Sequence, residues 1–234
     1  MFLTGAWRLA VFAVVPVKKL DVSKRRLSSV LIPLERRSLA LAMLEDLLTA
    51  LKASVVDEIV IASDDSVIHD VAGRFGVSYF STSAIGLNLA VEEATKWCVR
   101  KHADSVLVLP ADIPLVSPKD INQIVDVGSA CESVILSPSF NGGTNALFEN
   151  PPKLISPWFG LNSFAQHVRE ACKKHVRLRF YCSVGTVIDI DSEDDLKKFI
   201  EIENFTRSRK LLEQIGYVPV KPNSQVTKEN TKRR

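Results

Sequence analysis

Aliphatic and polar positions follow one another along the chain in blocks that predict strands alternating with helices. Mostly aliphatic runs predict buried strands at residues 9–17, 58–63, 105–109 and 133–137, and residues 77–80 predict a further short strand. Between them, apolar residues at three- and four-residue steps predict helices, with Pro33 and Pro118 at helix starts and Gly76 at a helix end. This order predicts an α/β fold with a mostly parallel sheet.

The pattern changes after residue 137, where glycine turns interrupt the alternation. The predicted elements are then a strand from Thr144, a helix ending near Lys174, strands at 177–181 and 186–190, and a helix from Ser192 to Ile202. Ser192 and Asp195 have the spacing of a capping box, which supports the last helix. Residues beyond 217 are polar and basic, which is typical of a flexible tail.

The composition fits one α/β domain of ordinary size. A chain of 234 residues with 46% hydrophobic content can bury a sizeable core. The 30 basic and 27 acidic residues leave a net charge of +3, which does not support nucleic-acid binding. The apolar run at 9–17 is shorter than the ~20 residues of a membrane span, and no cleavage site follows it. We therefore expect a cytoplasmic protein that binds neither nucleic acid nor membrane.

Cysteines and histidines form no recognisable site in the sequence. The cysteines show no CxxC spacing and are expected to be small buried residues: Cys98, Cys131, Cys172 and Cys182. The histidines fall in predicted helices or at their ends without a partnered nucleophile, and are expected on the surface or as core filling: His69, His102, His167 and His175. Without a GxSxG segment, hydrolase chemistry is unsupported.

Three aspartates are candidates for a metal site. Asp112 follows the strand at 105–109, at the carboxyl edge where open α/β sheets bind ligands. Asp189 and Asp191 would share one face of the strand at 186–190, because side chains repeat every two residues. Mg²⁺ commonly takes one or two carboxylates, and three could hold two metals. The alternative is that Asp112 caps a turn and Asp191 merely precedes a helix.

A basic loop and a set of small residues complete the candidate site. The loop at 16–27 follows the first strand and carries Lys18, Lys24, Arg25 and Arg26, which could bind a triphosphate or simply face solvent. It contains neither GxxxxGK[ST] nor GxGxxG. Hydroxyl groups of Thr144 and Ser163 and the backbone of Gly160 would suit a small phosphate or carboxylate, although each is also common in ordinary turns and helix starts.

Several segments, in order and at matching spacing, resemble the CofC/FbiD family of guanylyltransferases in coenzyme F420 biosynthesis. They are Val15–Lys18, Lys24–Leu27, Glu35–Arg37 leading into Leu39–Leu44, Gly86–Asn88, Leu109–Pro114, Gly143–Leu147, Phe159–Phe164 and Asp189–Leu196. The resemblance covers about residues 11–200 and leaves out the tail.

The resemblance implies a three-layer nucleotidyltransferase fold, similar to nucleotide-diphospho-sugar transferases, with a mixed central sheet. Members of the family transfer GMP from GTP to the phosphate of a three-carbon phospho-acid and release pyrophosphate. Archaeal members use 2-phospho-L-lactate and make lactyl-2-diphospho-5'-guanosine, and other members use phosphoenolpyruvate. We expect the archaeal reaction, with Mg²⁺ as cofactor and a possible homodimer.

The resemblance also assigns roles by position. It implies metal binding by Asp112, Asp189 and Asp191, catalysis by Asp112 with the basic residues Lys18, Lys24 and Arg26, and substrate binding by Thr144, Gly160, Ser163, Gly86 and Asn88. Arg25 departs from the family, which usually has a small residue there. The implied division is a single domain over 1–203, with a GTP-binding half at about 9–137 and an acceptor and metal half at about 138–203, followed by a C-terminal helix and basic flexible tail at 204–234.

Two alternatives stay open. One is a nucleotidyltransferase for another base or acceptor, such as a sugar phosphate or molybdopterin, although those enzymes usually have a glycine-rich first loop and this loop has no glycine. The other is a nucleotide-binding module without catalytic activity. Metal-dependent turnover of GTP would distinguish the second alternative from an enzyme.

Overall fold

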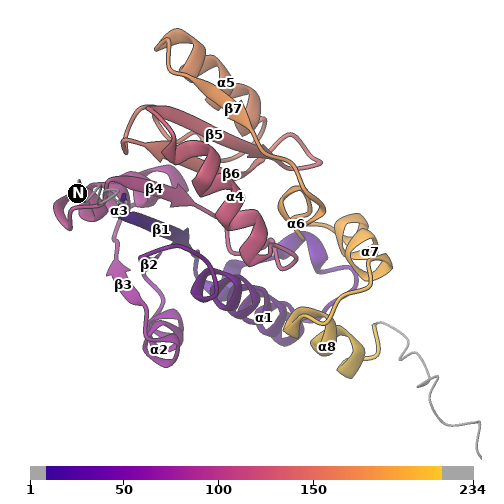
Figure 1. The fold of residues 1–234 in the computed structure, drawn as a ribbon. Helices are drawn as coiled ribbons and strands as arrows, with labels where there is room; N and C mark the ends of the chain where they lie inside the picture. The colour runs from indigo at the N-terminus through magenta and orange to yellow at the C-terminus, as the bar shows by residue number, and fades with distance from the viewer. Residues whose placement is uncertain (1–8, 218–234) are drawn as a thin grey trace, which may run out of the picture.

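The structure is a computed structural model, and it describes residues 9–217. The sheet formed by these residues has the order β3-β2-β1-β4-β6-β5-β7 (Figure 1). Its strands are β1 (Val11–Pro16), β2 (Glu58–Ser63), β3 (Ser78–Ser81), β4 (Ser105–Val108), β5 (Ser133–Pro138), β6 (Thr144–Asn150) and β7 (Leu178–Phe180). Only β6 runs antiparallel to its neighbours among these strands. The predicted mostly parallel, mixed sheet is confirmed.

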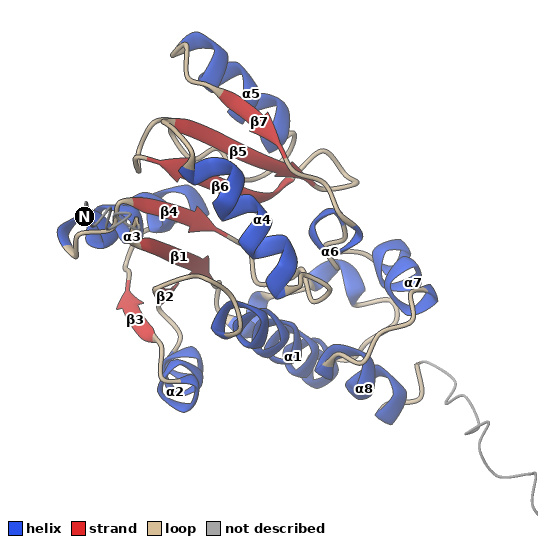
Figure 2. Cartoon of the chain, viewed as in Figure 1, coloured by secondary structure: helices blue, strands red, loops and turns tan. Residues whose placement is uncertain are grey.

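Helices cover both faces of this sheet (Figure 2). Their bounds are α1 (Pro33–Lys52), α2 (Ser66–Phe75), α3 (Leu87–Arg100), α4 (Pro118–Ser129), α5 (Ser163–Lys173), α6 (Val184–Val187), α7 (Glu193–Glu201) and α8 (Arg207–Gln214). One face packs on α1, α2 and α4, and the other packs on α3 and α5. The alternation of β1 explains the two layers, since Ala13 and Val15 face the first group and Val14 faces the second.

A third apolar cluster lies beside the sheet, where α7 and α8 pack against α1. Leu39 and Met43 of α1 contact Phe199 of α7 and Leu212 of α8 within this cluster. Asp46 of α1 accepts hydrogen bonds at the start of α8, from the Arg207 and Ser208 N–H groups at 2.7 and 2.9 Å. The C-terminal helix is therefore part of the packed structure, and the basic tail predicted after residue 217 lies outside the described residues.

The strand predicted at 186–190 is wrong. Residues 184–187 form the short helix α6, because Ser183 caps it by accepting a hydrogen bond from the Thr186 N–H at 3.2 Å. The following segment is extended but pairs with no strand within residues 9–217, and the Ile190 N–H instead donates to the Asp112 carbonyl at 3.0 Å. Ile188 and Ile190 are buried, so the alternation still turns Asp189 and Asp191 to the opposite side.

Burial of all four cysteines was also an incorrect expectation. Cys98 is buried and Cys131 is half-buried, but Cys172 and Cys182 are exposed, and all four are free thiols. No helix within residues 9–217 combines the length and the apolar character needed to cross a bilayer.

The topology brings distant parts of the chain to one edge of the sheet. β1 and β4 are parallel, with Val14 beside Val108, so the loop after β1 and the loop after β4 leave the sheet at the same edge. β6 is antiparallel to β4, with Leu147 beside Val108, so its first residues lie at that edge too. Lys18, Asp112 and Thr144 therefore follow or precede strand ends that meet at the carboxyl edge of β4.

Glu149, at the opposite end of β6, gives a prediction about stability. Its carboxyl group accepts hydrogen bonds from the Ile155 and Lys153 N–H groups at 2.9 and 3.3 Å, and its burial raises its pKa to about 7. Since the unfolded chain ionises near 4.5, the folded state holds an extra proton between these values, and stability falls as pH rises through that window.

We therefore expect the wild type to lose about 2 kcal/mol more stability than Glu149→Gln between pH 5 and pH 8. Urea unfolding at the two pH values measures this difference. Glu132→Gln, at an exposed position just before β5, is the matched control and should follow the wild type. An equal pH dependence in Glu149→Gln and the wild type would contradict the prediction.

Candidate active site

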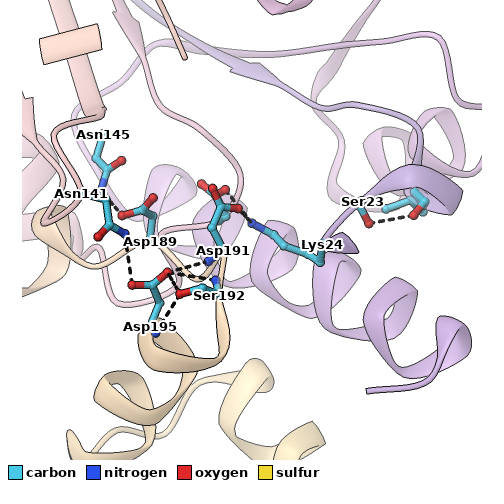
Figure 3. Close-up of polar contacts among 10 residues, drawn as sticks. Ser23, Lys24, Asn141, Asn145, Asp189, Asp191, Ser192 and Asp195 are labelled. Atoms are coloured by element: carbon cyan, nitrogen blue, oxygen red, sulfur yellow. Dashed lines mark hydrogen bonds and ion pairs between the residues drawn. The ribbon is translucent and has the colours of Figure 1, made fainter. Parts of the chain in front are cut away.

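Two aspartates hold the ammonium group of Lys24 at the carboxyl edge of the sheet. Lys24 Nζ lies 2.7 Å from Asp112 Oδ2 and 2.7 Å from Asp191 Oδ1, and the Lys24 side chain is only 8% exposed (Figure 3). Lys24 has a left-handed backbone, with φ of 51°, and begins a short 3-10 turn that is anchored by buried Leu27. The loop after β1 thus places a lysine between the loop after β4 and the segment after α6.

The charges of this group act strongly on one another. Burial alone would lower the pKa of Lys24, but the Asp112 and Asp191 carboxylates outweigh it and raise that pKa. Burial acts to raise the pKa of Asp191, but the Lys24 ammonium outweighs it, with Arg26 and Lys18 adding to the effect, so this pKa is lowered. Burial raises the pKa of Asp189 to about 6, and the neighbouring Asp112 carboxylate adds to that shift. The three carboxylates of Asp112, Asp189 and Asp191 therefore carry more negative charge than the single Lys24 ammonium neutralises.

Hydrogen bonds with α7 and with the turn between β5 and β6 fix the position of residues 189–191. Asp195 Oδ2 accepts from the Ser192 N–H at 2.9 Å and from Ser192 Oγ at 2.7 Å, which forms the capping box of α7. Asn141 Nδ2, from the turn after β5, donates to Asp195 Oδ1 at 3.2 Å (Figure 3). Asn145 of β6 donates to Asp189 Oδ1 at 3.4 Å. These contacts tie the aspartate segment to α7 and to both ends of the β5–β6 turn.

Thr144, at the start of β6, contacts two residues of α5. Its Oγ1 lies 2.9 Å from His167 Nδ1 and 3.2 Å from Ser163 Oγ. All three side chains are buried, and burial lowers the pKa of His167 to about 4, so the imidazole is neutral at pH 7. Thr144 contacts Ser163 and His167, whereas the next residue, Asn145, contacts Asp189. The start of β6 therefore connects the buried hydroxyl pair to the aspartates.

The loop before α5 presents the backbone of Gly160. Gly160 has φ of 133°, a conformation that L side chains rarely adopt, and its N–H has no partner among residues 9–217. Asn88 of α3 holds the neighbouring residue from both sides, since its Oδ1 accepts from the Phe159 N–H at 2.6 Å and its Nδ2 donates to the Phe159 carbonyl at 3.2 Å. Gly86 precedes α3 with φ of 108°.

The family model for CofC-like guanylyl transferases matches residues 11–234. The chain belongs to the CofC family. It is 35% identical over 191 residues to phosphoenolpyruvate guanylyltransferase of Rubrobacter xylanophilus, a match that covers 81% of this chain and 93% of that one. It is 32% identical over 218 residues to 2-phospho-L-lactate guanylyltransferase of Methanobrevibacter ruminantium, covering 88% and 92%.

Solved structures agree with this family in fold. The chain superposes on a candidate nucleotide-diphospho-sugar transferase from Desulfovibrio desulfuricans G20 with a TM-score of 0.77, covering 90% of this chain and 96% of that one. The two sequences are 14% identical, so this likeness shows the fold alone. The expected nucleotidyltransferase fold of the CofC family member is therefore confirmed.

The structure brings most residues predicted from the sequence to the same edge. Lys24, Asp112 and Asp191 are in direct contact, and Lys18 and Arg26 lie close enough to influence Asp191. Arg25 is exposed. Both polar atoms of Asn88 are bonded to Phe159, so in this CofC family member Asn88 holds the Gly160 loop in place.

Sequence reasoning missed three residues of this site. Asn145 and Asn141 belong to the glycine turn and the strand after it and have no pattern that indicates a role, although Asn145 directly follows Thr144. His167 was expected to be surface or core filling without a partnered nucleophile, and burial is correct, but it is hydrogen-bonded to the hydroxyl of Thr144. Its place four residues after Ser163, on the same helix face, is the signal that could have revealed it.

Mg²⁺, which the resemblance implies, can be tested against these oxygen atoms. Within the described part of the chain, no three His, Cys, Asp or Glu side chains lie close enough together to hold a metal ion as a group. Asp112 and Asp191 nevertheless hold a cation between them, the Lys24 ammonium, and Asp189 adds a further carboxylate. Such a set fits an open Mg²⁺ site with one or two carboxylates, completed by phosphate oxygens and water. The assignment of the metal ligands stays a prediction.

Proposed function

We propose that this protein transfers the GMP moiety of GTP to the phosphate of 2-phospho-L-lactate, giving lactyl-2-diphospho-5'-guanosine and pyrophosphate. One observation carries the proposal. At the start of β6, Asn145 contacts Asp189, next to the aspartates that hold Lys24. The neighbouring Thr144 belongs to a buried pair of hydroxyl groups. Membership of the CofC family supports this reaction class. The two relatives differ in acceptor: the match over 218 residues is to a 2-phospho-L-lactate guanylyltransferase, and the more identical match, at 35% over 191 residues, makes phosphoenolpyruvate the second candidate acceptor.

The residues of the basic loop act on the triphosphate. Lys24 lies in the centre of the cluster, and Lys18 and Arg26 are exposed and close to it. Positive charge there stabilises the negative charge that grows on pyrophosphate as the bond between the α- and β-phosphates breaks. Asp112, Asp189 and Asp191 would hold Mg²⁺, which supplies further positive charge to the phosphate oxygens when it is bound.

The acceptor would be held on the other side of the strand end. Thr144 and Ser163 offer hydroxyl groups, and Gly160 offers an N–H that has no partner in the described part of the chain; these groups suit the anionic oxygens of a small phospho-acid. The phosphate oxygen of the acceptor attacks the α-phosphorus, and the pair of electrons leaves with the bridging oxygen to pyrophosphate. Because that phosphate is ionised at pH 7, no general base is required. His167 is accordingly not needed as a base.

Pyrophosphate release by the purified protein tests the proposal. The protein is incubated with GTP and Mg²⁺, and with 2-phospho-L-lactate, phosphoenolpyruvate or no acceptor, and ATP replaces GTP as the control for the base. We expect release that depends on 2-phospho-L-lactate and on GTP, and loss of release when EDTA removes the metal. Release only with phosphoenolpyruvate would reassign the acceptor, and no release with either acceptor would favour a nucleotide-binding module without catalytic activity.

A further inference from the structure

A buried imidazole connects the two walls of the proposed acceptor site. His167 is 0% exposed, and its Nδ1 lies 2.9 Å from Thr144 Oγ1 at the start of β6. Its Nε2 accepts a hydrogen bond from the Trp158 N–H at 2.8 Å, two residues before Gly160. The same side chain therefore contacts both the strand and the loop that would hold the acceptor.

The bond to Trp158 decides which ring nitrogen carries the hydrogen. A backbone N–H can only donate, so Nε2 is the acceptor and carries no hydrogen. The buried imidazole is neutral at pH 7, because burial lowers its pKa to about 4. The single ring hydrogen then lies on Nδ1, where Thr144 Oγ1, at 2.9 Å, and the Ser163 backbone carbonyl are its acceptors, so that Nδ1 cannot accept a hydrogen bond from Thr144.

Counting the hydroxyl hydrogens gives the consequence for the site. Thr144 and Ser163 have two hydroxyl hydrogens, and the bond of 3.2 Å between their oxygens uses one of them. His167 Nδ1 is a donor and cannot accept the other. Among the residues that the structure describes, neither hydroxyl has a further hydrogen-bond partner. One hydroxyl hydrogen of the pair is therefore left to donate to something else.

We propose that His167 is a positioning residue for the acceptor substrate: because its Nδ1 carries the ring hydrogen and cannot accept from Thr144, it leaves one hydroxyl hydrogen of the Thr144–Ser163 pair to bind an anionic oxygen of the acceptor. This inference rests on the proposed function for the identity of the acceptor. The ligand chemistry is that of a phosphate or carboxylate oxygen, which accepts strong hydrogen bonds and donates none at pH 7.

The tautomer is measured first, on the protein without substrates. In a protein with ¹⁵N-labelled histidine, long-range ¹H–¹⁵N spectra at pH 7 should show His167 as neutral with its hydrogen on Nδ1. The signal that disappears in His167→Gln identifies it, and exposed His69, His102 and His175 serve as comparisons. A charged ring, or a hydrogen on Nε2, would overturn the inference whether or not the protein is active.

Kinetics of a pair of amide variants test the role of the donor. Asparagine can place its amide N–H near the position of Nδ1, whereas the longer glutamine side chain places its amide near Nε2. We expect His167→Gln to raise the KM for the acceptor about tenfold or more, with the KM for GTP within about twofold of the wild type. His167→Asn should recover part of this loss. Equal KM values for the two variants, or equal rises for acceptor and GTP, would show a merely structural role and overturn the inference.

A double-mutant cycle with Thr144→Val completes the test. If His167 acts through the Thr144 hydroxyl, His167→Gln should change the acceptor KM little once Thr144→Val is present, whereas additive effects would overturn the inference. His175→Gln, at an exposed position after the same helix, is the matched control. If no acceptor supports turnover, the proposed function fails. Binding of 2-phospho-L-lactate to the protein can then still be measured from the change in the His167 ¹⁵N signals when the compound is added. An unchanged signal would then overturn the inference.

Discussion

Replacing Asp112 by asparagine is expected to lower kcat for pyrophosphate release by about 10³-fold, the equivalent of several kcal/mol of transition-state stabilisation. Asp112 Oδ2 contacts Lys24 at 2.7 Å, and its carboxylate adds to the negative charge around Asp189. Asparagine has the same shape and keeps an oxygen that can accept from Lys24, but it lacks the charge that would hold Mg²⁺ on the reacting phosphates. Folding should therefore change little while catalysis is lost.

Steady-state kinetics at saturating GTP and acceptor, together with urea unfolding, measure both parts of this expectation. The free energy of unfolding should stay within about 1 kcal/mol of the wild type, as is usual for a substitution that keeps shape and contacts. Asp194→Asn is the matched control, because the Asp194 side chain is 82% exposed and contacts only Lys197, at 3.7 Å, among the described residues. Activity of Asp112→Asn within tenfold of the wild type would remove Asp112 from the proposed mechanism.

The core of the fold could be predicted from local patterns. The aliphatic runs that became β1, β2 and β4 are buried on both faces, as expected for parallel strands covered by helices, so the pattern and the structure agree. The prediction at 186–190 was wrong for a physical reason. Alternation of apolar and polar residues indicates that a segment is extended and which of its side chains face the core. Both indications are correct for this segment, in which Ile188 and Ile190 are buried. Whether a neighbouring strand is present to pair with it depends on tertiary structure.

The site was predictable only as separate residues at strand and loop ends. Sequence could place Asp112 after a buried strand, but not the contact of Lys24 with both Asp112 and Asp191, which are 88 and 167 residues away. The role of His167 was hidden for a similar reason, since its partners Thr144 and Trp158 come from other elements. The spacing of His167 and Ser163 on one helix face can be read from the sequence, but their contacts with Thr144 and Trp158 cannot, because the fold alone brings these elements together.

Replacing Lys24 by methionine is expected to lower kcat about 10²-fold and to raise the KM for GTP about tenfold, since a buried positive charge near the leaving phosphates is lost. Among the described residues, Lys24 pairs with Asp112 and Asp191, and a triphosphate would offer its ammonium further oxygens of the same charge. Lys19→Met is the matched control in the same loop, because the Lys19 side chain is 60% exposed and pairs with Asp64, away from the cluster. Equal losses in the two variants would mean that Lys24 contributes no more than general surface charge.

The same variant separates a structural role of Lys24 from a catalytic one. Without its ammonium, Asp112 and Asp191 repel each other, but the Asp191 side chain is 46% exposed and water can solvate it, so we expect a stability loss of only about 1–2 kcal/mol instead of the 3–5 typical of a fully buried pair. A divalent cation could replace the lost charge between the carboxylates. Mg²⁺ should therefore raise the melting temperature of Lys24→Met more than that of the wild type, which already holds a cation there. If Mg²⁺ stabilises neither protein, the aspartates do not form a metal site, and Lys24 is their permanent counter-charge.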